Sequence, residues 1–206
     1  MYRVGIITAS DKGSRGERID ESGQKIKDIV SQFGYEVSYY KVLPDDKETL
    51  SNEMKKLCDE IRISTAYLSD TENGNMFPSK EKLDEFIKAF NLKDDEEDRF
   101  YDENLVDIIL TTGGTGFSKR DNTPEATLEI AEKLVPGISE AVRNYSMQFT
   151  KKAMLSRAVS VIRKETLIIN MPGSPKAVKE SMECIMPALN HGLDILKGTA
   201  SECARK

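Results

Sequence analysis

The sequence predicts an α/β fold: a single three-layer domain in which a mostly parallel sheet is covered by helices on both faces, plus an acidic insertion. Short runs rich in β-branched residues, such as residues 4–9 and 106–110, are apolar at almost every position. This is typical of strands buried on both faces of a parallel sheet. Between these runs lie segments whose apolar residues recur with helical spacing. The alternation of the two patterns predicts a parallel sheet packed between helices.

The first sixty residues supply two strands and two helices. Residues 4–9 are the first strand, and residues 10–16 form a polar loop at its carboxyl end, where open α/β sheets bind ligands. A helix over residues 22–33 ends at Gly34, and one of its faces carries the apolar residues Ile26, Ile29, Val30 and Phe33. Residues 36–43 are the second strand. A second amphipathic helix is marked by Leu50, Met54, Leu57 and Ile61.

The second half of the chain continues the alternation after the central strand at residues 106–110. Thr123-Pro124-Glu125 predicts a helix start, because a hydroxyl cap, a proline and an acid stand in their favoured positions. The apolar residues that line this helix are Leu128, Ala131, Leu134 and Val135. Pro136-Gly137 breaks it, and residues 138–148 resume as helix. Strands at 158–162 and 167–170 precede a last helix over 176–196, and residues 199–206 form a loose tail.

An acidic insertion interrupts this domain, which spans residues 1–198, at about residues 62–104. Residues 70–104 hold 12 acids and 5 bases, a net charge of −7, so the rest of the chain carries +2. Residues 79–90 can form a short helix, and the acidic block at 94–98 is expected to be solvated. A calcium site is the alternative for this block, but the glycine and the alternating spacing of an EF-hand loop are absent. The insertion is therefore predicted to be peripheral to the chemistry.

Composition limits the classes of function. A net charge of −5 over 206 residues argues against a general nucleic-acid binder. No apolar run approaches the ~20 residues of a membrane helix, and no signal peptide is visible, so no membrane partner is expected. The three cysteines, Cys58, Cys184 and Cys203, have neither zinc spacing nor a disulfide framework. A reducing cytoplasm is the expected location.

The most informative stretch is the glycine-rich turn after the central strand. Three glycines in four residues, Gly113, Gly114 and Gly116, let the backbone approach a ligand and point its N–H groups at it, an arrangement that suits phosphates. The turn then delivers Lys119 and Arg120 as cations and Asp121 as a possible metal ligand. An ordinary tight turn is the alternative. The loop matches neither the phosphate-binding GxxxxGK loop nor the dinucleotide-binding GxGxxG loop.

Several motifs stand in an order and spacing that resemble a known family. They are VGIITASDKGS from residue 4, LPDD from 43, TTGGTGFSKRDNTPEAT from 111, PGISEAVR from 136, AMLSRA from 153 and LIINMPGSPKAV from 167. In this pattern the chain resembles the molybdopterin adenylyltransferases, of the stand-alone bacterial type, which prepare molybdopterin for molybdate insertion. The resemblance covers residues 1–60 and 105–198, and the region 62–104 departs from it.

The resemblance implies a reaction in which ATP and molybdopterin give adenylylated molybdopterin and pyrophosphate, with Mg²⁺. It places the essential aspartates at Asp45 and Asp121, which are expected to be catalytic and to hold the metal. Asp45 ends the second strand and Asp121 lies just past the central strand. Because parallel strands end at the same edge of a sheet, the two carboxylates can converge. Mg²⁺ takes one or two such carboxylates and completes its shell with phosphates and waters.

The resemblance also implies the substrate contacts. The glycine loop is expected to bind substrate through Thr112, Gly113, Gly114, Thr115, Gly116 and Arg120. Ser156 and Arg157 are expected in the molybdopterin pocket, where an arginine can bind phosphate with two donors. The turn Pro172, Gly173 and Ser174 is expected near the nucleotide.

Each of these positions has a purely structural alternative. Asp45 could cap the helix that begins near Lys47, and Asp121 could cap the helix at Pro124 or pair with Arg120. Ser156 and Arg157 could form an ordinary turn, and Ser174 could cap the last helix, a role that is compatible with a place near the nucleotide.

Two alternative functions stay open: a molybdopterin-binding module without catalysis, and a related branch of the same family. A non-catalytic module would be expected to lose an aspartate, and both are present. By analogy with bacterial members we expect a homotrimer, with contact to the molybdate-insertion protein as a further possible partner.

Overall fold

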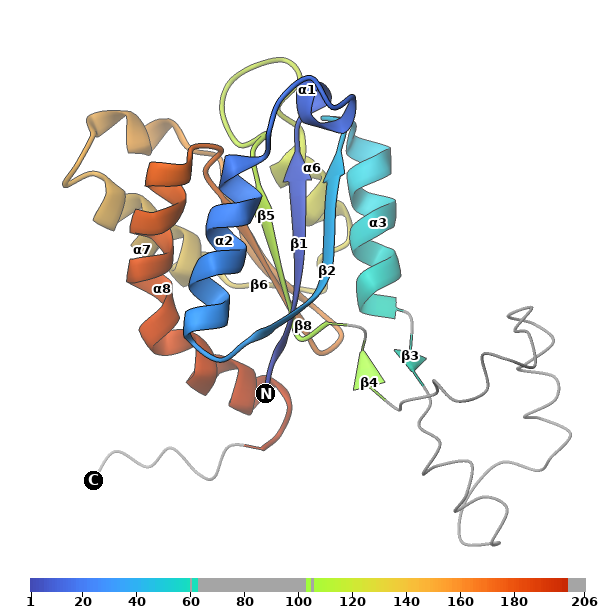
Figure 1. Ribbon diagram of the computed structural model, residues 1–206. Coiled ribbons are helices and arrows are strands. Elements are labelled where there is room, and N and C mark those ends of the chain that lie inside the picture. Colours follow the sequence, from blue (N-terminus) through green and yellow to red (C-terminus); the bar gives the residue numbers. More distant parts are fainter. Residues whose placement is uncertain (60, 63–102, 105, 200–206) are drawn as a thin grey trace, which may run out of the picture. The chain divides into compact units, whose positions relative to one another are not determined.

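The computed structural model describes residues 1–59, 61–62, 103–104 and 106–199, and Figure 1 traces the chain from blue to red. The chain divides into two compact units, residues 1–59 with 106–206, and residues 60–105. In the second unit, two short antiparallel strands are described, β3 (Ile61–Arg62) and β4 (Glu103–Asn104). The helix predicted at 79–90, the acidic block at 94–98 and the tail beyond residue 199 lie outside the described residues.

The first unit is built on a six-stranded sheet with the order β2-β1-β5-β8-β7-β6. The strands β2, β1, β5 and β8 run parallel to one another, whereas β7 is antiparallel to both β8 and β6. The mostly parallel sheet is therefore confirmed. The strands span β1 (Arg3–Ala9), β2 (Glu36–Leu43), β5 (Ile108–Thr112), β6 (Lys133–Leu134), β7 (Ser160–Arg163) and β8 (Thr166–Met171).

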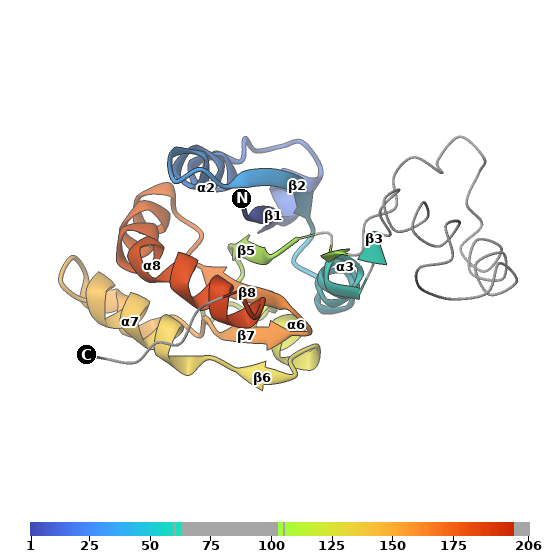
Figure 2. The same cartoon turned by 90° about the horizontal axis from the view of Figure 1, so that it is seen from below.

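Helices cover both faces of this sheet, which confirms the three layers (Figure 2). One face carries α2 (Glu21–Gln32), α7 (Pro136–Ser146) and α8 (Pro175–Leu196), and the other carries α3 (Lys47–Asp59) and α6 (Thr123–Glu129). The first group shares one buried cluster, in which Ile26 of α2, Val142 of α7 and Val178 of α8 pack against β1, β5 and β8. Among the described residues, no helix combines the length and apolarity needed to cross a bilayer.

The apolar strands predicted from the sequence form the centre of the core. Val4, Ile6 and Ile7 of β1 and Ile108, Ile109 and Leu110 of β5 are completely buried, as expected for strands covered on both faces. Burying one such side chain contributes about 2 kcal/mol. Since these strands are parallel neighbours, the loops that follow β1, β2, β5 and β8 all emerge at one edge of the sheet.

One predicted helix is wrong in its second half. The helix α6 ends at Glu129, and residues 133–134 form the edge strand β6 instead of continuing the helix. Leu134, predicted on a buried helix face, is 64% exposed. Backbone bonds to β7 explain the change, since the Val135 N–H donates to the Ser160 carbonyl at 2.8 Å. Pro136 does not break a helix but begins α7, at the first position, where its missing N–H costs nothing.

Three further boundaries differ from the prediction. The loop predicted at 10–16 contains the one-turn helix α1 (Asp11–Ser14), which Ser10 caps by accepting from the Gly13 N–H at 3.1 Å. The helix α3 ends at Asp59, so Ile61 belongs to β3, which pairs with a strand more than forty residues away. The strand predicted at 158–162 is displaced to β7, and the 3₁₀ helix η2 (Lys151–Leu155) lies before it. Local spacing cannot report such long-range backbone pairing.

Candidate functional site

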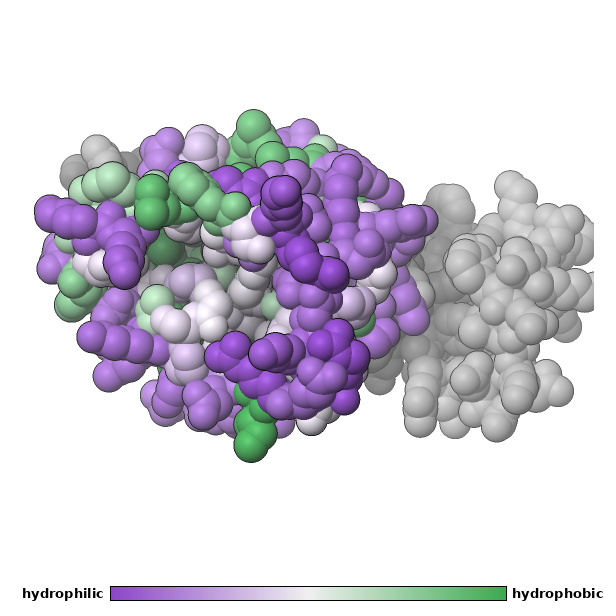
Figure 3. Space-filling model, turned by 90° about the horizontal axis from the view of Figure 1, so that it is seen from above, coloured by the Kyte–Doolittle hydropathy of each residue, from purple (hydrophilic) through white to green (hydrophobic). Residues whose placement is uncertain are grey.

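The candidate site lies at the edge of the sheet where the parallel strands end. Figure 3 looks onto this edge and shows a hollow that is bordered partly by hydrophilic and partly by hydrophobic residues. A cleft of about 230 Å³ opens here. Its lining residues lie at and beyond the carboxyl ends of the four parallel strands. They are Thr8, Ala9, Ser10, Gly13 and Arg18–Ser22 after β1, Val42 and Asp45 after β2, Thr112–Gly114 and Asp121 after β5, and Gly173 and Pro175 after β8. Of the predicted site residues, Asp45, Asp121, Thr112, Gly113, Gly114 and Gly173 therefore meet in one cleft.

Two glycines of the loop after β5 are required by the backbone. Gly113 has φ +88° and Gly114 has φ +62°, in the left-handed region that side chains disfavour. A Cβ at Gly113 would lie 2.4 Å from the Ala9 carbonyl oxygen, so the loop packs directly on the end of β1. Because neither residue has a side chain, the backbone of Gly113 and Gly114 itself lines the cleft.

Hydroxyl groups tie this loop to its neighbours. The buried Thr112 hydroxyl donates to the Pro172 carbonyl at 2.7 Å, and the Thr123 hydroxyl donates to the Gly113 carbonyl at 2.9 Å. The Ser22 hydroxyl donates to the Gly173 carbonyl at 2.8 Å. The predicted substrate residue Thr112 therefore uses its hydroxyl to join the glycine loop to the turn after β8.

Arg157 holds the far side of the same loop. Its Nε donates to the Gly116 carbonyl at 2.7 Å, its Nη2 donates to the Asp121 carbonyl at 2.5 Å, and its Nη1 pairs with Glu125. All three nitrogens are thus engaged within the protein. Arg157 therefore braces the glycine loop, and its place in the molybdopterin pocket, which the resemblance implies, stays a prediction.

We expect Arg157→Lys to lower the free energy of unfolding by about 2 kcal/mol, because one ammonium group cannot replace contacts to three acceptors. Urea denaturation would measure the change. The matched control is Arg15→Lys, since Arg15 pairs with Glu17 at 2.7 Å on an exposed surface and should change stability by less than about 0.5 kcal/mol. Equal losses in the two variants would contradict the bracing role.

Asp45 faces the cleft and does not cap α3. Its Oδ2 accepts from the Asp11 N–H at 3.1 Å, and its own N–H donates to Asp11 Oδ1 at 3.2 Å. The cap of α3 is the next residue, Asp46, which accepts from the Thr49 N–H at 2.8 Å. The helix-capping role that was the structural alternative for Asp45 therefore belongs to Asp46.

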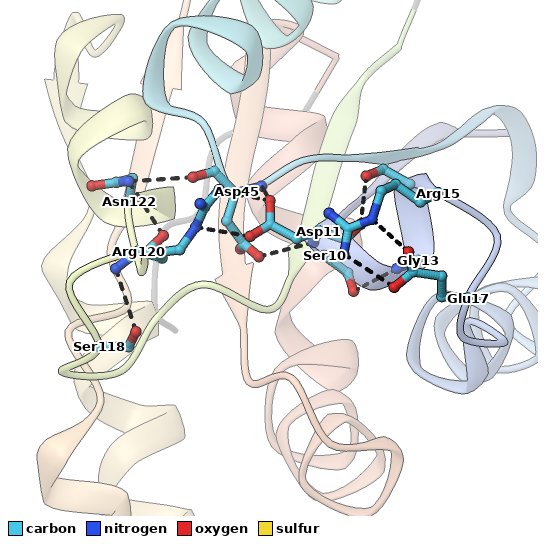
Figure 4. Close-up of polar contacts among 10 residues, drawn as sticks. Ser10, Asp11, Gly13, Arg15, Glu17, Asp45, Ser118, Arg120 and Asn122 are labelled. Atoms are coloured by element: carbon cyan, nitrogen blue, oxygen red, sulfur yellow. Dashed lines mark hydrogen bonds and ion pairs between the residues drawn. The ribbon is translucent and has the colours of Figure 1, made fainter.

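Asp121 is likewise free of the roles that competed with ligand binding. Its Oδ2 accepts from the Ser118 N–H at 2.9 Å, which closes the loop before α6, and Asn122 occupies the cap position of that helix. Arg120 pairs with Asp11 instead, through two contacts of 2.8 Å each (Figure 4). Arg120 thus lies beside the cleft as part of an Asp45–Asp11–Arg120 group.

Burial and charge act together on Asp45. Burial raises the pKa of the Asp45 carboxyl above its ordinary value, and the negative charges of Asp11 and Asp121 raise it further. The hydrogen bond from Asp11 and the positive charge of Arg120 oppose this rise in pKa without cancelling it. The cleft therefore holds excess negative charge at Asp45, an arrangement that favours a cation.

We expect Asp45→Asn to raise the melting temperature at pH 7 by about 2 °C, because the variant no longer keeps this charge partly buried. The folded state binds the Asp45 proton more tightly than the unfolded chain. Its contribution to stability is present at low pH and is lost as pH rises through the raised pKa. The advantage of the variant should therefore vanish toward about pH 4. Thermal melts with a chelator present would measure it, and a lower melting temperature for the variant at pH 7 would contradict it.

Several residues at the site were not predicted, among them Arg18 and Asp20, which line the cleft, and Asp11, which contacts Asp45. Asp20 caps α2 and accepts from the Gly23 N–H at 2.9 Å, while its second oxygen accepts from the hydroxyls of Thr8 and Tyr40 at 2.5 Å each. Arg18 lines the cleft, and no hydrogen bond or ion pair engages it within the described part of the chain. The polar loop at 10–16, at the carboxyl end of the first strand, was the available signal for Asp11.

A second cavity of about 270 Å³ lies on the other side of the glycine loop. The predicted residues Thr115, Gly116, Ser156 and Pro172 line it, together with side chains from α7, η2 and α8. Its walls are more apolar, with Val142, Ala153 and Leu155 among them. Ser174 faces neither cavity and caps α8, accepting from the Ala177 N–H at 3.2 Å. The glycine loop is thus a wall common to a polar cleft and an apolar cavity.

The residues of the cleft fit a hard cation better than a soft one. Within residues 1–59, 61–62, 103–104 and 106–199 there is no group of three or more His, Cys, Asp or Glu side chains arranged to hold a metal ion. Four acidic residues line the cleft, Asp20, Glu21, Asp45 and Asp121, and Asp20 is engaged as the cap of α2. The predicted metal ligands are the pair Asp45 and Asp121. That set is too small for a structural metal cage, but it is what Mg²⁺ uses when substrate phosphates supply the remaining oxygens.

Comparison with known proteins gives one family. The family described as "Probable molybdopterin binding domain" matches residues 5–66 and 89–191. The molybdopterin adenylyltransferase of Haemophilus influenzae is 55% identical over 188 residues, which are 89% of this chain and 72% of that protein. The molybdopterin adenylyltransferase of Helicobacter pylori is 29% identical over 205 residues, which are 98% of this chain and 92% of that protein.

Solved structures agree. The molybdopterin biosynthesis enzyme MoaB from Thermus thermophilus shares 34% identity and a TM-score of 0.70, and the match covers 96% of this chain and 98% of that one. By its motifs, its sheet and these similarities, the chain belongs to the molybdenum cofactor biosynthesis family of molybdopterin-binding domains.

Proposed function

We propose that this chain is a molybdopterin adenylyltransferase, which joins the adenylyl group of ATP to molybdopterin and releases pyrophosphate. One observation carries the proposal: the glycine loop is a wall of both cavities. Two ligands that carry phosphates can therefore present them to the same backbone from opposite sides. The names of the Haemophilus and Helicobacter relatives support the same reaction.

The polar cleft suits the phosphates of ATP. The Arg18 side chain lines it without a partner among the described residues, and the backbone of Gly113 and Gly114 is held toward it. Arginine binds phosphate with parallel donors, and a glycine backbone allows close approach. The apolar cavity suits the flat pterin ring of molybdopterin, with Ser156 in its wall as the resemblance implies.

The reaction is one displacement at phosphorus. An oxygen of the terminal phosphate of molybdopterin forms a bond to the α-phosphorus of ATP, and the bond from that phosphorus to the bridging β-oxygen breaks. Pyrophosphate leaves with the electron pair. Both reactants are anions, so the chain contributes mainly by holding them in line and by offsetting their charge. The braced glycine loop is suited to positioning the two reactants, and Arg18 is suited to offsetting their negative charge.

Mg²⁺ would be held by Asp45 and Asp121, two of the four carboxylates that line the cleft. When bound, it would neutralise negative charge on the phosphates of ATP. The excess of negative charge around Asp45 supports this assignment. The homotrimer, the contact with the molybdate-insertion protein and the cytoplasmic location belong to the same proposal and rest on family resemblance.

The decisive experiment uses the full chain with molybdopterin, Mg²⁺ and ATP labelled at the α-phosphate. We expect label to enter molybdopterin with release of one pyrophosphate per adenylyl group, and a chelator to stop the transfer. Binding of molybdopterin without pyrophosphate release would identify a non-catalytic binding module instead. Failure to bind molybdopterin at all would overturn the proposal.

A further inference from the structure

The ion pair between Arg120 and Asp11 occupies an arginine that the resemblance assigns to the substrate. Arg120 Nη2 donates to Asp11 Oδ1 at 2.8 Å, and Arg120 Nε lies 2.8 Å from Asp11 Oδ2 (Figure 4). Two nitrogens on one side of the guanidinium thus meet both oxygens of one carboxylate. Arginine binds two oxygens of a phosphate in the same side-on way. Asp11 therefore fills the side of Arg120 that is suited to a phosphate.

The two partners differ in how firmly the protein holds them. The Asp11 N–H donates to Asp45 Oδ2 at 3.1 Å, and the Asp45 N–H donates to Asp11 Oδ1 at 3.2 Å. Asp11 is also the first residue of α1, whose cap is Ser10. Its side chain is 23% exposed, whereas the side chain of Arg120 is 65% exposed. Asp11 is thus the fixed partner, and Arg120 is the one with room to turn away.

Stability alone gives little reason for this ion pair. An exposed pair strengthens folding by about fivefold at most in the equilibrium constant, because water screens the charges and two side chains lose freedom. The same weakness means that a second anion can take the arginine. A chain of phosphates carries more negative charge than one carboxylate, so it competes well for the same guanidinium.

An anion in the polar cleft lies within the reach of Arg120. The next residue, Asp121, lines the cleft. Burial raises the pKa of the Asp45 carboxyl and the positive charge of Arg120 opposes the rise, so this charge acts on a second residue of the cleft wall. Arg18 lines the cleft with no partner in the described part of the chain. An entering phosphate therefore meets one open arginine and one that Asp11 occupies.

We propose that Asp11 is a positioning residue that holds Arg120 at the rim of the cleft until a phosphate of the bound polyphosphate takes its place on the guanidinium. The inference rests on the proposed function, since it takes the polar cleft as the polyphosphate site, and it deepens that function by adding a step to binding. The reciprocal hydrogen bonds with Asp45 keep Asp11 in place when Arg120 leaves.

The test removes the charge of Asp11 and keeps its hydrogen bond. In Asp11→Asn the side-chain oxygen still accepts from the Asp45 N–H, but the guanidinium loses its ionic partner. Asp46→Asn is the matched control. Hydrogen bonds from Thr49 and the positive charge of Arg120 both lower the pKa of the Asp46 carboxyl, so Arg120 also feels this charge, but Asp46 holds Thr49 rather than Arg120.

Calorimetric titration with inorganic tripolyphosphate, in the presence of a chelator, measures affinity without any reaction. We expect Asp11→Asn to bind tripolyphosphate at least about threefold more tightly than the wild type, because binding no longer breaks an ion pair. Asp46→Asn should change the affinity by less than about 1.5-fold. A structural role alone would make Asp11→Asn bind more weakly or equally, and either result would overturn the inference.

A second pair of variants separates the ion pair from the general effect of charge. In an Arg120→Gln background, Asp11→Asn should increase affinity for tripolyphosphate at least about twofold less than it does when Arg120 is present. An equal increase in both backgrounds would show that Asp11 acts only through repulsion of the anion, and it would contradict the proposed contact.

The wild type provides a test that needs no variant, in case Asp11→Asn fails to fold. In a crystal structure of the wild-type chain with tripolyphosphate, the guanidinium of Arg120 should contact a phosphate and no longer contact Asp11. Arg120 still paired with Asp11 beside bound tripolyphosphate would refute the inference. So would the absence of tripolyphosphate from the cleft.

These outcomes are distinct from those of the proposed function. Wild type that transfers the adenylyl group, while Asp11→Asn gains no affinity, sinks only the role of Asp11. Wild type that exchanges Asp11 for tripolyphosphate at Arg120, yet never transfers an adenylyl group, supports the role of Asp11 and sinks the proposed enzyme.

Discussion

Replacing Asp45 or Asp121 with asparagine should lower single-turnover adenylylation by about two orders of magnitude or more, on the order of the ~3 kcal/mol typical for one lost electrostatic contact. The reason is that negative charge is most crowded when the two phosphates react. A lost carboxylate that holds Mg²⁺ therefore costs more in the transition state than in the ground state. Binding of molybdopterin should survive, because neither aspartate lines the second cavity.

Both substitutions remove charge without removing the local hydrogen bonds. Asp45 accepts from the Asp11 N–H, and Asp121 accepts from the Ser118 N–H. An asparagine side-chain oxygen can accept in either place, so the loops should keep their conformation. A loss of activity would then report the charge of the carboxylate rather than a collapsed loop.

Single-turnover assays with ATP, Mg²⁺ and molybdopterin decide the matter, and Asp46→Asn is the control. Asp46 stands next to Asp45, and as a helix cap it tolerates asparagine. Its variant should retain nearly full turnover. If Asp45→Asn or Asp121→Asn also keeps near-wild-type turnover, that aspartate has no part in the mechanism.

Gly114→Val should weaken binding of ATP or molybdopterin by about tenfold or more, with little change in helical content. A Cβ at this position would lie 2.4 Å from Thr123 Oγ1 and 3.1 Å from Asp45 Oδ1. The backbone there has φ +62°, which costs a side chain roughly 1–2 kcal/mol. The loop must therefore shift, and both the phosphate cradle and the Asp45 carboxylate shift with it.

Gly34→Val separates backbone strain from the clash. Gly34 has a similar φ of +77°, but a Cβ there would meet nothing within 4 Å among the described atoms. It ends α2, away from the cleft, so its variant should lose stability without losing ligand affinity. Circular dichroism and ligand titrations on both variants measure the difference. Unchanged titration curves for Gly114→Val would show that the loop is only a tight turn.

The strands of the core could be predicted because strands buried on both faces consist almost entirely of apolar residues. The uninterrupted apolar runs of β1 and β5 admit only an element buried on both faces, and their alternation with helices gives a parallel sheet. The order of these strands also placed Asp45 and Asp121 at one edge, and both side chains do line one cleft. Their catalytic roles stay predictions.

The edge strand β6 could not be predicted, because its partner is a backbone far along the chain. Leu134 fits the apolar spacing of a helix, but the N–H groups of residues 132 and 135 bond to β7 carbonyls much further along the sequence. Exposing one leucine side chain costs less free energy than leaving backbone N–H and C=O groups unpaired along the sheet edge. The competing interaction exists only after the sheet has formed.

The sequence by itself determined the α/β class, the glycine loop and the aspartates at the strand ends, because local spacing and chain order fix these features. Only the tertiary structure decided the partners of the charged side chains. Arg157 braces the glycine loop, and Arg120 pairs with Asp11. The partner of a long charged side chain depends on which backbone or carboxylate the fold brings within about 3 Å, and that distance is not encoded in any local pattern.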